Sequence, residues 1–213
     1  MKVDIISMSW TIKVPPDSIR ERFKAAIERA SANNILIFCS AADGGHMSGQ
    51  HYPSALSTEA FIRVGAARAD GLPYEKVGEL SGVEFIMPGV DVMPLETSAG
   101  ISQEVRDRSV TGSSVAAALG SGLAAMILYC IYIAALSGKD GIKLDDLDLL
   151  HSPAEMKKAI ERFGMSTSKD SGGKFVEVFQ KLEKKSLELS PSTLPDTARG
   201  LIAGLARDFI TRS

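Results

Sequence analysis

The sequence predicts an α/β fold, in which a mostly parallel sheet is covered by helices on both faces. Residues 3–9 (VDIISMS) and 35–42 (ILIFCSAA) are short apolar runs without the polar alternation of a strand that has one solvated face. Residues 17–33 between them are expected to be helical, capped by Asp17 or Ser18. Strand, helix and strand in this order form a βαβ unit, whose strands are parallel. The helix carries one apolar stripe, formed by Ile19, Phe23, Ala26, Ile27 and Ala30.

The later elements continue this alternation. Further strands are predicted at residues 60–67 (AFIRVGAA) and 83–87 (VEFIM), and a long apolar helix is expected to begin at Ser114. Beyond it we expect a loop with acidic residues, a helix that starts with a capping box and a proline, and two amphipathic helices. The loop spans residues 137–150, the capping box residues 152–155, and the two amphipathic helices residues 174–187 and 196–211. The polar residues 95–108 and the glycine-rich residues 43–54 are interpreted as further loops.

The composition excludes several classes of function. The 213 residues have a formal net charge of -2 and are 45% hydrophobic, so neither a disordered chain nor a nucleic-acid partner is expected. Cys39 and Cys130 lie in apolar runs and are interpreted as buried free thiols rather than a disulfide. His46, His51 and His151 lack the spacing of metal-ligand motifs. Neither a metal nor another cofactor is expected.

Residues 115–136 have no charge over 22 residues, which is long enough for a transmembrane helix. The first half of this run is rich in alanine, glycine and serine, and its flanks lack the basic clustering of a membrane anchor. The run therefore favours the central helix of a globular domain, with a membrane-anchored or purely structural protein as the alternative. The N-terminus has no signal-peptide pattern, so a cytoplasmic location is expected for the chain as written.

Ser114 is the strongest candidate for chemistry, because it follows Gly112 and a small residue and opens the long apolar helix. Unsatisfied backbone N–H groups at a helix N-terminus can stabilise negative charge on a substrate oxygen while the hydroxyl attacks. Taken alone, the position is better explained by a serine that only caps the helix.

The order of several short motifs resembles the C-terminal half of a subtilisin-like serine peptidase (subtilase). IISMSW is similar to the family strand that ends in Met-Ser-Leu-Gly, and ILIFCSAADGG to the strand that leads to Ala-Ala-Gly-Asn. HYPSALSTEAFIRVGAARADG resembles its Tyr-Pro-Ala segment and the following Val-Gly-Ala strand, and FIMPGVDV its Ala-Pro-Gly element. TGSSVAAALGSGLAAMIL resembles the signature Gly-Thr-Ser-x-Ala-x-Pro with its helix. The resemblance covers residues 3–163, and the helix that begins SPAEMKK matches the one that usually closes the domain.

The resemblance implies a three-layer, subtilisin-like fold whose N-terminal part of the sheet is missing. A partial peptidase domain is expected at residues 1–165, followed by a helical tail at residues 166–213. Ser114 would be the nucleophile and Asp43 would occupy the oxyanion-hole position. The strand end formed by Ser9, Trp10 and Thr11 would pair with an extended substrate backbone. Trp10 is equally well interpreted as an ordinary core or rim aromatic residue.

The sequence departs from the family pattern in four ways. No Asp-Thr-Gly or His-Gly-Thr motif is present, and His46 and His51 are interpreted as loop residues rather than substitute bases. Asp43 stands where the family has an asparagine, and an ionised carboxylate offers no hydrogen-bond donor to an oxyanion. Ser113 replaces the threonine of the signature, and Ala118 replaces its proline.

The sequence therefore predicts a serine endopeptidase, represented by the part that carries the nucleophile. The expected partners are a peptide or protein substrate and a missing N-terminal segment that carries the catalytic Asp and His, with neither nucleic acid nor membrane. Without a base the chain alone is expected to be inactive. The alternative is a degenerate, non-catalytic peptidase-like domain that binds a peptide or a partner. An open sheet edge would make the isolated chain poorly soluble or marginally stable.

Overall fold

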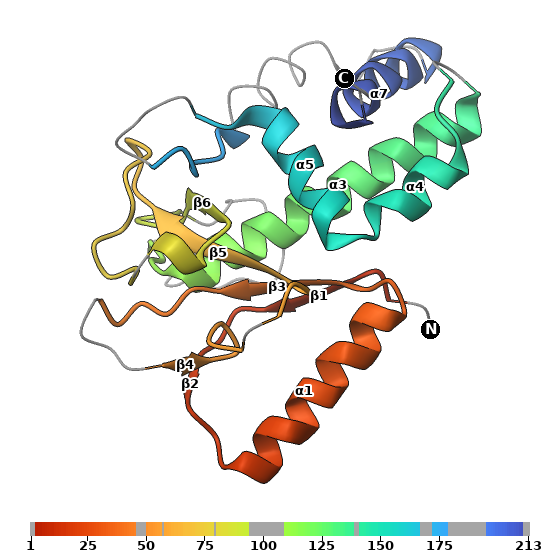
Figure 1. Cartoon of the computed structure of the whole chain (residues 1–213). Helices are drawn as coiled ribbons and strands as arrows, with labels where there is room; N and C mark the ends of the chain where they lie inside the picture. The colour runs from red at the N-terminus through yellow and green to blue at the C-terminus, as the bar shows by residue number, and fades with distance from the viewer. Residues whose placement is uncertain are drawn as a thin grey trace, which may run out of the picture.

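The computed structural model describes residues 3–45, 50–56, 58–78, 80–93, 109–138, 141–166, 172–178 and 195–210. Its centre is a parallel four-stranded sheet with the order β1-β3-β5-β6 (Figure 1). The strands are β1 (Ile5–Met8), β3 (Leu36–Ser40), β5 (Phe61–Ala67) and β6 (Phe85–Pro88). This confirms the predicted α/β class with a mostly parallel sheet. Within the described residues β1 pairs with β3 alone and forms one edge of the sheet.

Helices cover both faces of the sheet, which gives the predicted three layers (Figure 1). One face carries α1 (Asp17–Ala32), and the other carries the long helix α3 (Ser113–Ser137). Around α3 lie α4 (Leu144–Leu150), α5 (Pro153–Gly164) and α7 (Pro195–Ile210). A short antiparallel ribbon, β2 (Ile12–Lys13) with β4 (His51–Tyr52), and a 3-10 turn (Leu80–Gly82) complete the described elements.

The core consists of two apolar layers, one on each side of the sheet. Strand β3 is buried along its whole length and divides its side chains between them. Leu36 and Phe38 belong to the layer beneath α3, while Ile37 and Cys39 belong to the layer beneath α1. A strand in this position has no solvated face, so residues 35–42 are apolar without alternation.

Both cysteines are free and buried, as predicted. Burial disfavours the charged thiolate and raises the pKa of Cys39 from 9.0 to about 12, against the opposing charge of Arg63. Burial alone raises the pKa of Cys130 to about 11.

Neither thiol of the folded chain is therefore expected to react with DTNB near pH 8, whereas both are expected to react in denaturant. Because both pKa values are higher in the folded than in the unfolded state, the thiols favour folding below about pH 9. The free energy of unfolding should fall as the pH rises from about 9 towards 11 and beyond. Thiol titration and denaturant unfolding at several pH values measure the two effects. Rapid modification of the folded chain near pH 8 would contradict this assignment.

Small residues on α3 allow it to approach the sheet closely. A Cβ atom added at Gly120 would lie 3.3 Å from Val64 Cγ2 and 3.4 Å from Met87 Sδ. Gly122, two residues further on, has no neighbouring atom within 4 Å of such a Cβ. The alanine- and glycine-rich first half of this helix is therefore explained by packing on the strands.

Gly120 and Gly122 form a matched pair for testing this contact. Gly120→Leu is expected to lower the free energy of unfolding by about 1–3 kcal/mol, because the added atoms overpack a filled site. Gly122→Leu should be neutral or stabilising by up to about 1 kcal/mol, because leucine favours the helix more than glycine does. Urea unfolding of both variants measures the difference. Equal effects of the two substitutions would show that α3 does not pack on the sheet through Gly120.

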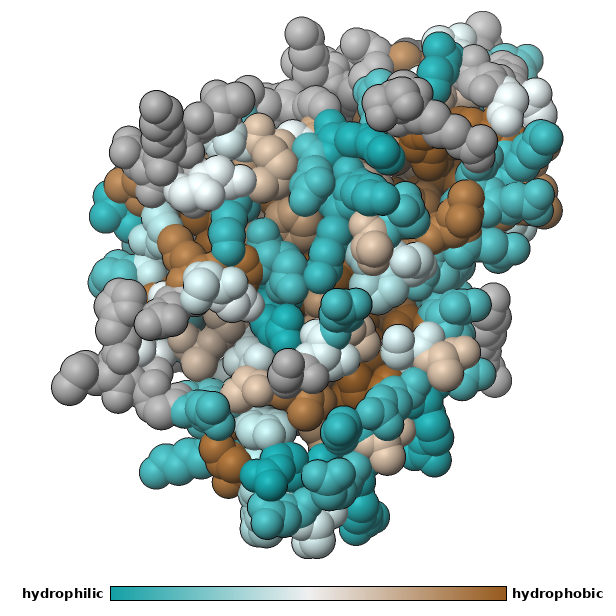
Figure 2. Space-filling view, in the orientation of Figure 1, coloured by the Kyte–Doolittle hydropathy of each residue, from teal (hydrophilic) through white to brown (hydrophobic). Residues whose placement is uncertain are grey.

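Helix α3 is long and apolar enough to cross a membrane, and half of its most apolar stretch is buried inside the structure. The buried side faces the sheet and α7. Its exposed side still carries large apolar side chains, and Figure 2 shows apolar surface over the helical layer at the top right. The exposed large side chains of this helix are Tyr129, Tyr132 and Leu136.

The structure corrects several sequence-based boundaries. Residues 137–150 are not simply a loop, because they contain α4. The acidic residues open this helix, and the Asp146 carboxylate accepts a hydrogen bond from the Lys143 N–H at 2.8 Å. Acidic groups favour a helix N-terminus, which the loop interpretation did not consider. Likewise, the predicted loop at residues 43–54 contains the strand β4.

Helix starts were predicted less accurately than helix positions. Pro16 is the N-cap of α1, whereas Asp17 lies in the first turn and pairs with Arg20 at 2.7 Å. Helix α5 begins at Pro153 as predicted, but the Ser152 side chain makes no capping hydrogen bond.

The helix predicted at residues 174–187 starts later than expected, because Val178 is helical in the described part of this range whereas residues 174–177 are not. Phe175 bridges to Ile86 in parallel and Val176 to Met165 in antiparallel, so this stretch begins as extended chain at the edge of the sheet. Residues 179–187 and 95–108 lie outside the described residues.

The C-terminal helix α7 matches the helix predicted at residues 196–211 and packs against α3 and α5. The rings of Phe163 and Phe209 stack with their centroids 5.7 Å apart, and the Arg162 guanidinium donates a hydrogen bond to the Phe209 carbonyl at 3.0 Å. Residues after position 165 therefore contribute to the core of the same globular unit.

Candidate active site

A pocket of about 340 Å³ lies where β1 and β3 end and α3 begins. The carboxyl ends of parallel strands meet at one edge of a sheet, where ligand sites of α/β proteins usually form. The pocket contains all five site residues that the sequence predicted, together with one histidine. Its lining consists of Ser9, Trp10, Thr11, Ser40, Ala41, Ala42, Asp43, Gly44, His51 and Ser114.

Ser114 and Ser113 occupy opposite environments at the start of α3. Ser113 is the first helical residue and is fully buried, whereas the following Ser114 is exposed and lines the pocket. Its exposure, together with the positive end of the helix dipole at the start of α3, gives the Ser114 hydroxyl the setting that a nucleophile needs. The buried Ser113 hydroxyl cannot meet a substrate.

Gly112 shapes the entry into this helix. Its φ of 150° lies in the region that favours glycine, and an added Cβ would lie 3.1 Å from Asp43 Oδ2 and 3.3 Å from Ser114 Oγ. Any other residue here would strain the backbone and crowd both the carboxylate and the candidate nucleophile.

Asp43 holds the start of α3 through two hydrogen bonds from Ser113. The backbone N–H of Ser113 donates to Asp43 Oδ2 at 2.7 Å, and its hydroxyl donates to Oδ1 at 2.6 Å. The same hydroxyl oxygen accepts a hydrogen bond from the Ala66 N–H at 3.0 Å. Ser113 thus ties together β5, the loop after β3 and the helix N-terminus. We refer to this set of three residues, Asp43, Ser113 and Ala66, as the clamp.

The clamp gives Asp43 a contact that the sequence did not predict. Both carboxylate oxygens accept hydrogen bonds, as expected for an ionised group at the positive end of a helix dipole. In this arrangement Asp43 has no proton to offer to a substrate oxygen. The backbone N–H groups of Ser113, Val115 and Ala116 donate to Asp43 and Gly112, which leaves the Ser114 N–H as the donor at the start of α3.

Trp10 lies on the rim of the pocket. Its side chain is 43% exposed and meets the ring of Phe23 edge to face, with the centroids 6.1 Å apart. This position is consistent with the rim interpretation.

The three histidines have different surroundings. His51 was predicted as a loop residue, but it lies in β4 and lines the pocket. Its Nδ1 is buried without a hydrogen-bond partner. His151 is buried away from the pocket, with Nδ1 3.0 Å from the Leu147 carbonyl oxygen and Nε2 3.3 Å from an Asp4 carboxylate oxygen. His46 lies outside the described residues.

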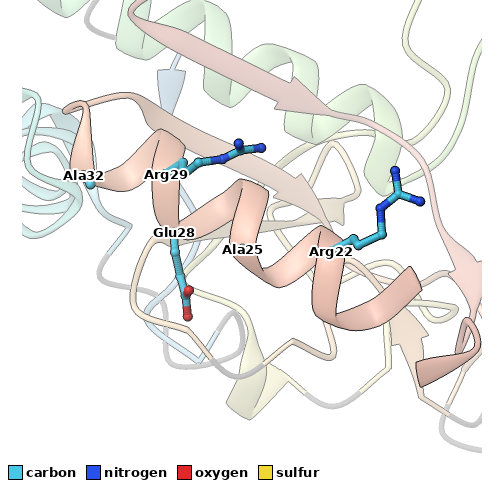
Figure 3. A pocket seen from close by; sticks show the side chains of 5 residues that line it. All are labelled: Arg22, Ala25, Glu28, Arg29 and Ala32. Atoms are coloured by element: carbon cyan, nitrogen blue, oxygen red, sulfur yellow. The ribbon is translucent and has the colours of Figure 1, made fainter. Parts of the chain in front are cut away.

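Among the described residues, no group of three or more His, Cys, Asp or Glu residues could hold a metal ion. A second hollow, of about 550 Å³, lies on α1 (Figure 3) and contains neither a nucleophile nor a strand end. Its described lining comes from that single helix: Arg22, Ala25, Glu28, Arg29 and Ala32.

The parallel sheet, its two helical layers and the serine at the start of a central helix define a subtilisin-like α/β protein. The family model of the subtilase family, Peptidase S8, matches residues 1–140 of the 213 residues. The chain therefore belongs to the subtilase family, the family that the sequence motifs resemble. This membership supports a peptidase-like function.

Solved structures support the same fold. The prenylagaramide maturation protease PagA superposes with a TM-score of 0.55 at 22% identity, covering 84% of this chain and 61% of its own. The S218A mutant of the protease domain of PatA gives a TM-score of 0.54 at 20% identity, covering 85% and 60%. The chain thus spans about three fifths of the length of these proteases. No curated protein sequence matches the chain.

Proposed function

We propose that this chain is the nucleophile-bearing part of a serine endopeptidase, with Ser114 as the nucleophile. The observation that carries the proposal is the exposed Ser114 at the N-terminus of α3, inside a pocket at the carboxyl ends of β1 and β3. The substrate is a peptide held in extended form along Ser9, Trp10 and Thr11, which continue the line of β1.

In the proposed reaction, Ser114 Oγ attacks a peptide carbonyl carbon and gives its proton to a general base. The resulting oxyanion accepts a hydrogen bond from the backbone N–H of Ser114. The C–N bond then breaks, and the base returns the proton to the leaving amine. Water then attacks the carbonyl carbon of the acyl-enzyme and gives a proton to the base. The bond from this carbon to Ser114 Oγ breaks, the base returns the proton to Oγ, and the carboxylic acid product leaves. The clamp keeps Ser113, and with it the adjacent Ser114, in a fixed position throughout.

The general base is proposed to come from a further polypeptide segment that carries His and Asp. Among the described residues no histidine forms a hydrogen bond with Ser114, and a serine hydroxyl without a base is a poor nucleophile at neutral pH. Two features fit such a segment. In the described part of the chain, the edge of β1 that faces away from β3 pairs with no strand, so a further strand has room to pair there. Ser114 is also exposed, so its hydroxyl is open to a base from another segment.

A fluorophosphonate probe with added imidazole tests the nucleophile in the chain as it stands. Free imidazole should act as a substitute base, so the rate of labelling should rise with imidazole concentration, by about tenfold or more at high concentration. Ser114→Ala should abolish the labelling, while Ser121→Ala, which changes another serine of α3, should preserve it. Labelling that survives Ser114→Ala would reject Ser114 as the nucleophile.

A second candidate is a non-catalytic domain that binds peptides in the same pocket. It is favoured by Asp43, whose two oxygens accept hydrogen bonds from Ser113, so that this side chain has no proton to donate to an oxyanion. This candidate predicts peptide binding without labelling of Ser114, with or without imidazole.

We also propose that α3 is a core helix and that the chain acts on its substrate in the aqueous phase, with the cytoplasm as its location. The support is the burial of half of the most apolar stretch of α3. Alkaline carbonate extraction should release the expressed chain from membranes. Retention in the lipid fraction would contradict this proposal.

A further inference from the structure

We propose that His51 is a specificity-determining residue, which binds a peptide side chain ending in a carboxylate. This inference rests on the proposed function, because it assumes that the pocket beside Ser114 receives peptides. It concerns a different property of the site, namely which side chain the pocket accepts.

The first observation is the position and the unfulfilled hydrogen bonding of His51. The residue enters the pocket from β4, on a different segment from Ser114, and its backbone carbonyl is fixed by a hydrogen bond from Ser54 Oγ at 3.1 Å. Its Nδ1 is buried and has no partner. A buried nitrogen without a hydrogen bond is unfavourable, and such groups are uncommon in folded proteins. A ligand that reorients the ring and provides an acceptor removes this penalty.

The second observation is a positive charge beside His51. Lys13 of β2 is the direct partner of His51 in the antiparallel ladder. Side chains of directly opposed residues lie on the same face of such a pair. Lys13 is exposed, and it forms no ion pair within the part of the chain that the structure describes. Its charge therefore favours an anionic group near the imidazole.

The third observation concerns Asp43, the acidic residue in the pocket lining. Both of its oxygens are taken up by Ser113 at the N-terminus of α3, where the partial positive charge of the helix offsets the carboxylate. Asp43 is thus engaged with the helix rather than free to pair with a cationic side chain of a ligand. The other polar side chains of the lining are neutral: the indole of Trp10 and the hydroxyls of Ser9, Thr11, Ser40 and Ser114.

These observations together favour a carboxylate over an apolar or cationic side chain. The imidazole donates a hydrogen bond to the carboxylate, and Lys13 adds a longer-range attraction. A charge-assisted hydrogen bond of this kind corresponds to a preference of about tenfold or more.

Fluorescence anisotropy with the full chain tests the inference. A labelled extended peptide is varied one position at a time with Glu, Gln, Leu or Lys. At one position, the Glu peptide should bind about tenfold more tightly than the Leu peptide, with Gln between them and Lys weakest. His51→Leu should bring the Glu and Leu peptides within about twofold of each other. His151→Gln, which changes a buried histidine outside the pocket, should keep the preference.

The outcomes distinguish a failure of this inference from a failure of the proposed function. Tight binding without a preference for Glu at any position would overturn the inference and leave peptide binding in place. A preference that persists in His51→Leu would also overturn it. If His51→Leu instead removes imidazole-independent labelling of Ser114 by the fluorophosphonate probe, His51 is the base and not the specificity residue. Absence of all peptide binding would overturn both the inference and the proposed peptide site.

Discussion

Asp43→Ala is expected to destabilise the chain by about 2 kcal/mol, although Asp43 itself is exposed to solvent. The substitution leaves the N–H and hydroxyl of the fully buried Ser113 without their acceptor, at 2.7 and 2.6 Å respectively in the intact protein. It also removes a negative charge from the N-terminus of α3, which contributes up to about 1 kcal/mol of that loss. Denaturant unfolding of the variant measures the change.

A double-mutant cycle separates the clamp from a general effect of removing an acid. Ser113→Ala also destabilises, because the buried Ala66 N–H loses its acceptor. The double variant Asp43→Ala/Ser113→Ala should lose less than the sum of the two, with a coupling of about 1–2 kcal/mol. Asp148→Ala, which removes an exposed carboxylate from α4, should change stability by less than about 0.5 kcal/mol. Additive single effects would show that the two side chains do not act together.

Supplying the missing base is expected to have the largest effect on activity. A polypeptide with the Asp-Thr-Gly and His-Gly-Thr motifs, joined to this chain or co-expressed with it, should raise peptide hydrolysis by about 10⁴-fold or more. The magnitude comes from subtilisin itself, a member of the family, in which removal of a single triad member costs about 10⁴–10⁶-fold in kcat. Ser114→Ala should cancel the whole gain.

In the same complemented protein, Asp43→Asn tests the contribution of residue 43 to stabilising the oxyanion. An asparagine can donate a hydrogen bond to the oxyanion, so hydrolysis should increase by about 10²-fold, although the clamp weakens. The expected factor is taken from the effect of the oxyanion-hole asparagine on kcat in subtilisin. Complementation that produces a stable complex without hydrolysis, in both the parent and Asp43→Asn, would favour the non-catalytic alternative.

The sequence was sufficient for the parts of the fold that hydrophobic patterning determines. β1, β3, β5, β6, α1 and α3 all lie within a few residues of their predicted positions, because each buries an apolar run on the sheet or on a helix face. The segments it missed have weaker local signals. Helix α4 was interpreted as part of a loop because its first turn is acidic. Phe175 and Val176 become extended only by pairing with Ile86 and Met165.

The candidate site was predictable in its location but not in its contacts. Ser9, Trp10, Thr11, Asp43 and Ser114 were each selected from motif order, and the structure brings them to one pocket. The clamp joins residues 70 positions apart, Asp43 and Ser113, and such a pairing depends on how β3 and α3 meet in space. His51 lines the pocket because of its pairing with β2, which no local pattern indicated.

The most direct measurement is peptide mapping of the chain after reaction with a fluorophosphonate probe, in the presence of imidazole or the complementing polypeptide. We expect the phosphonyl group on Ser114, with the adjacent Ser113 unmodified because it is buried in the clamp. A modification on Ser113, on Ser9 or on another serine, or a chain that remains unmodified under both conditions, would contradict the assignment of Ser114 as the nucleophile.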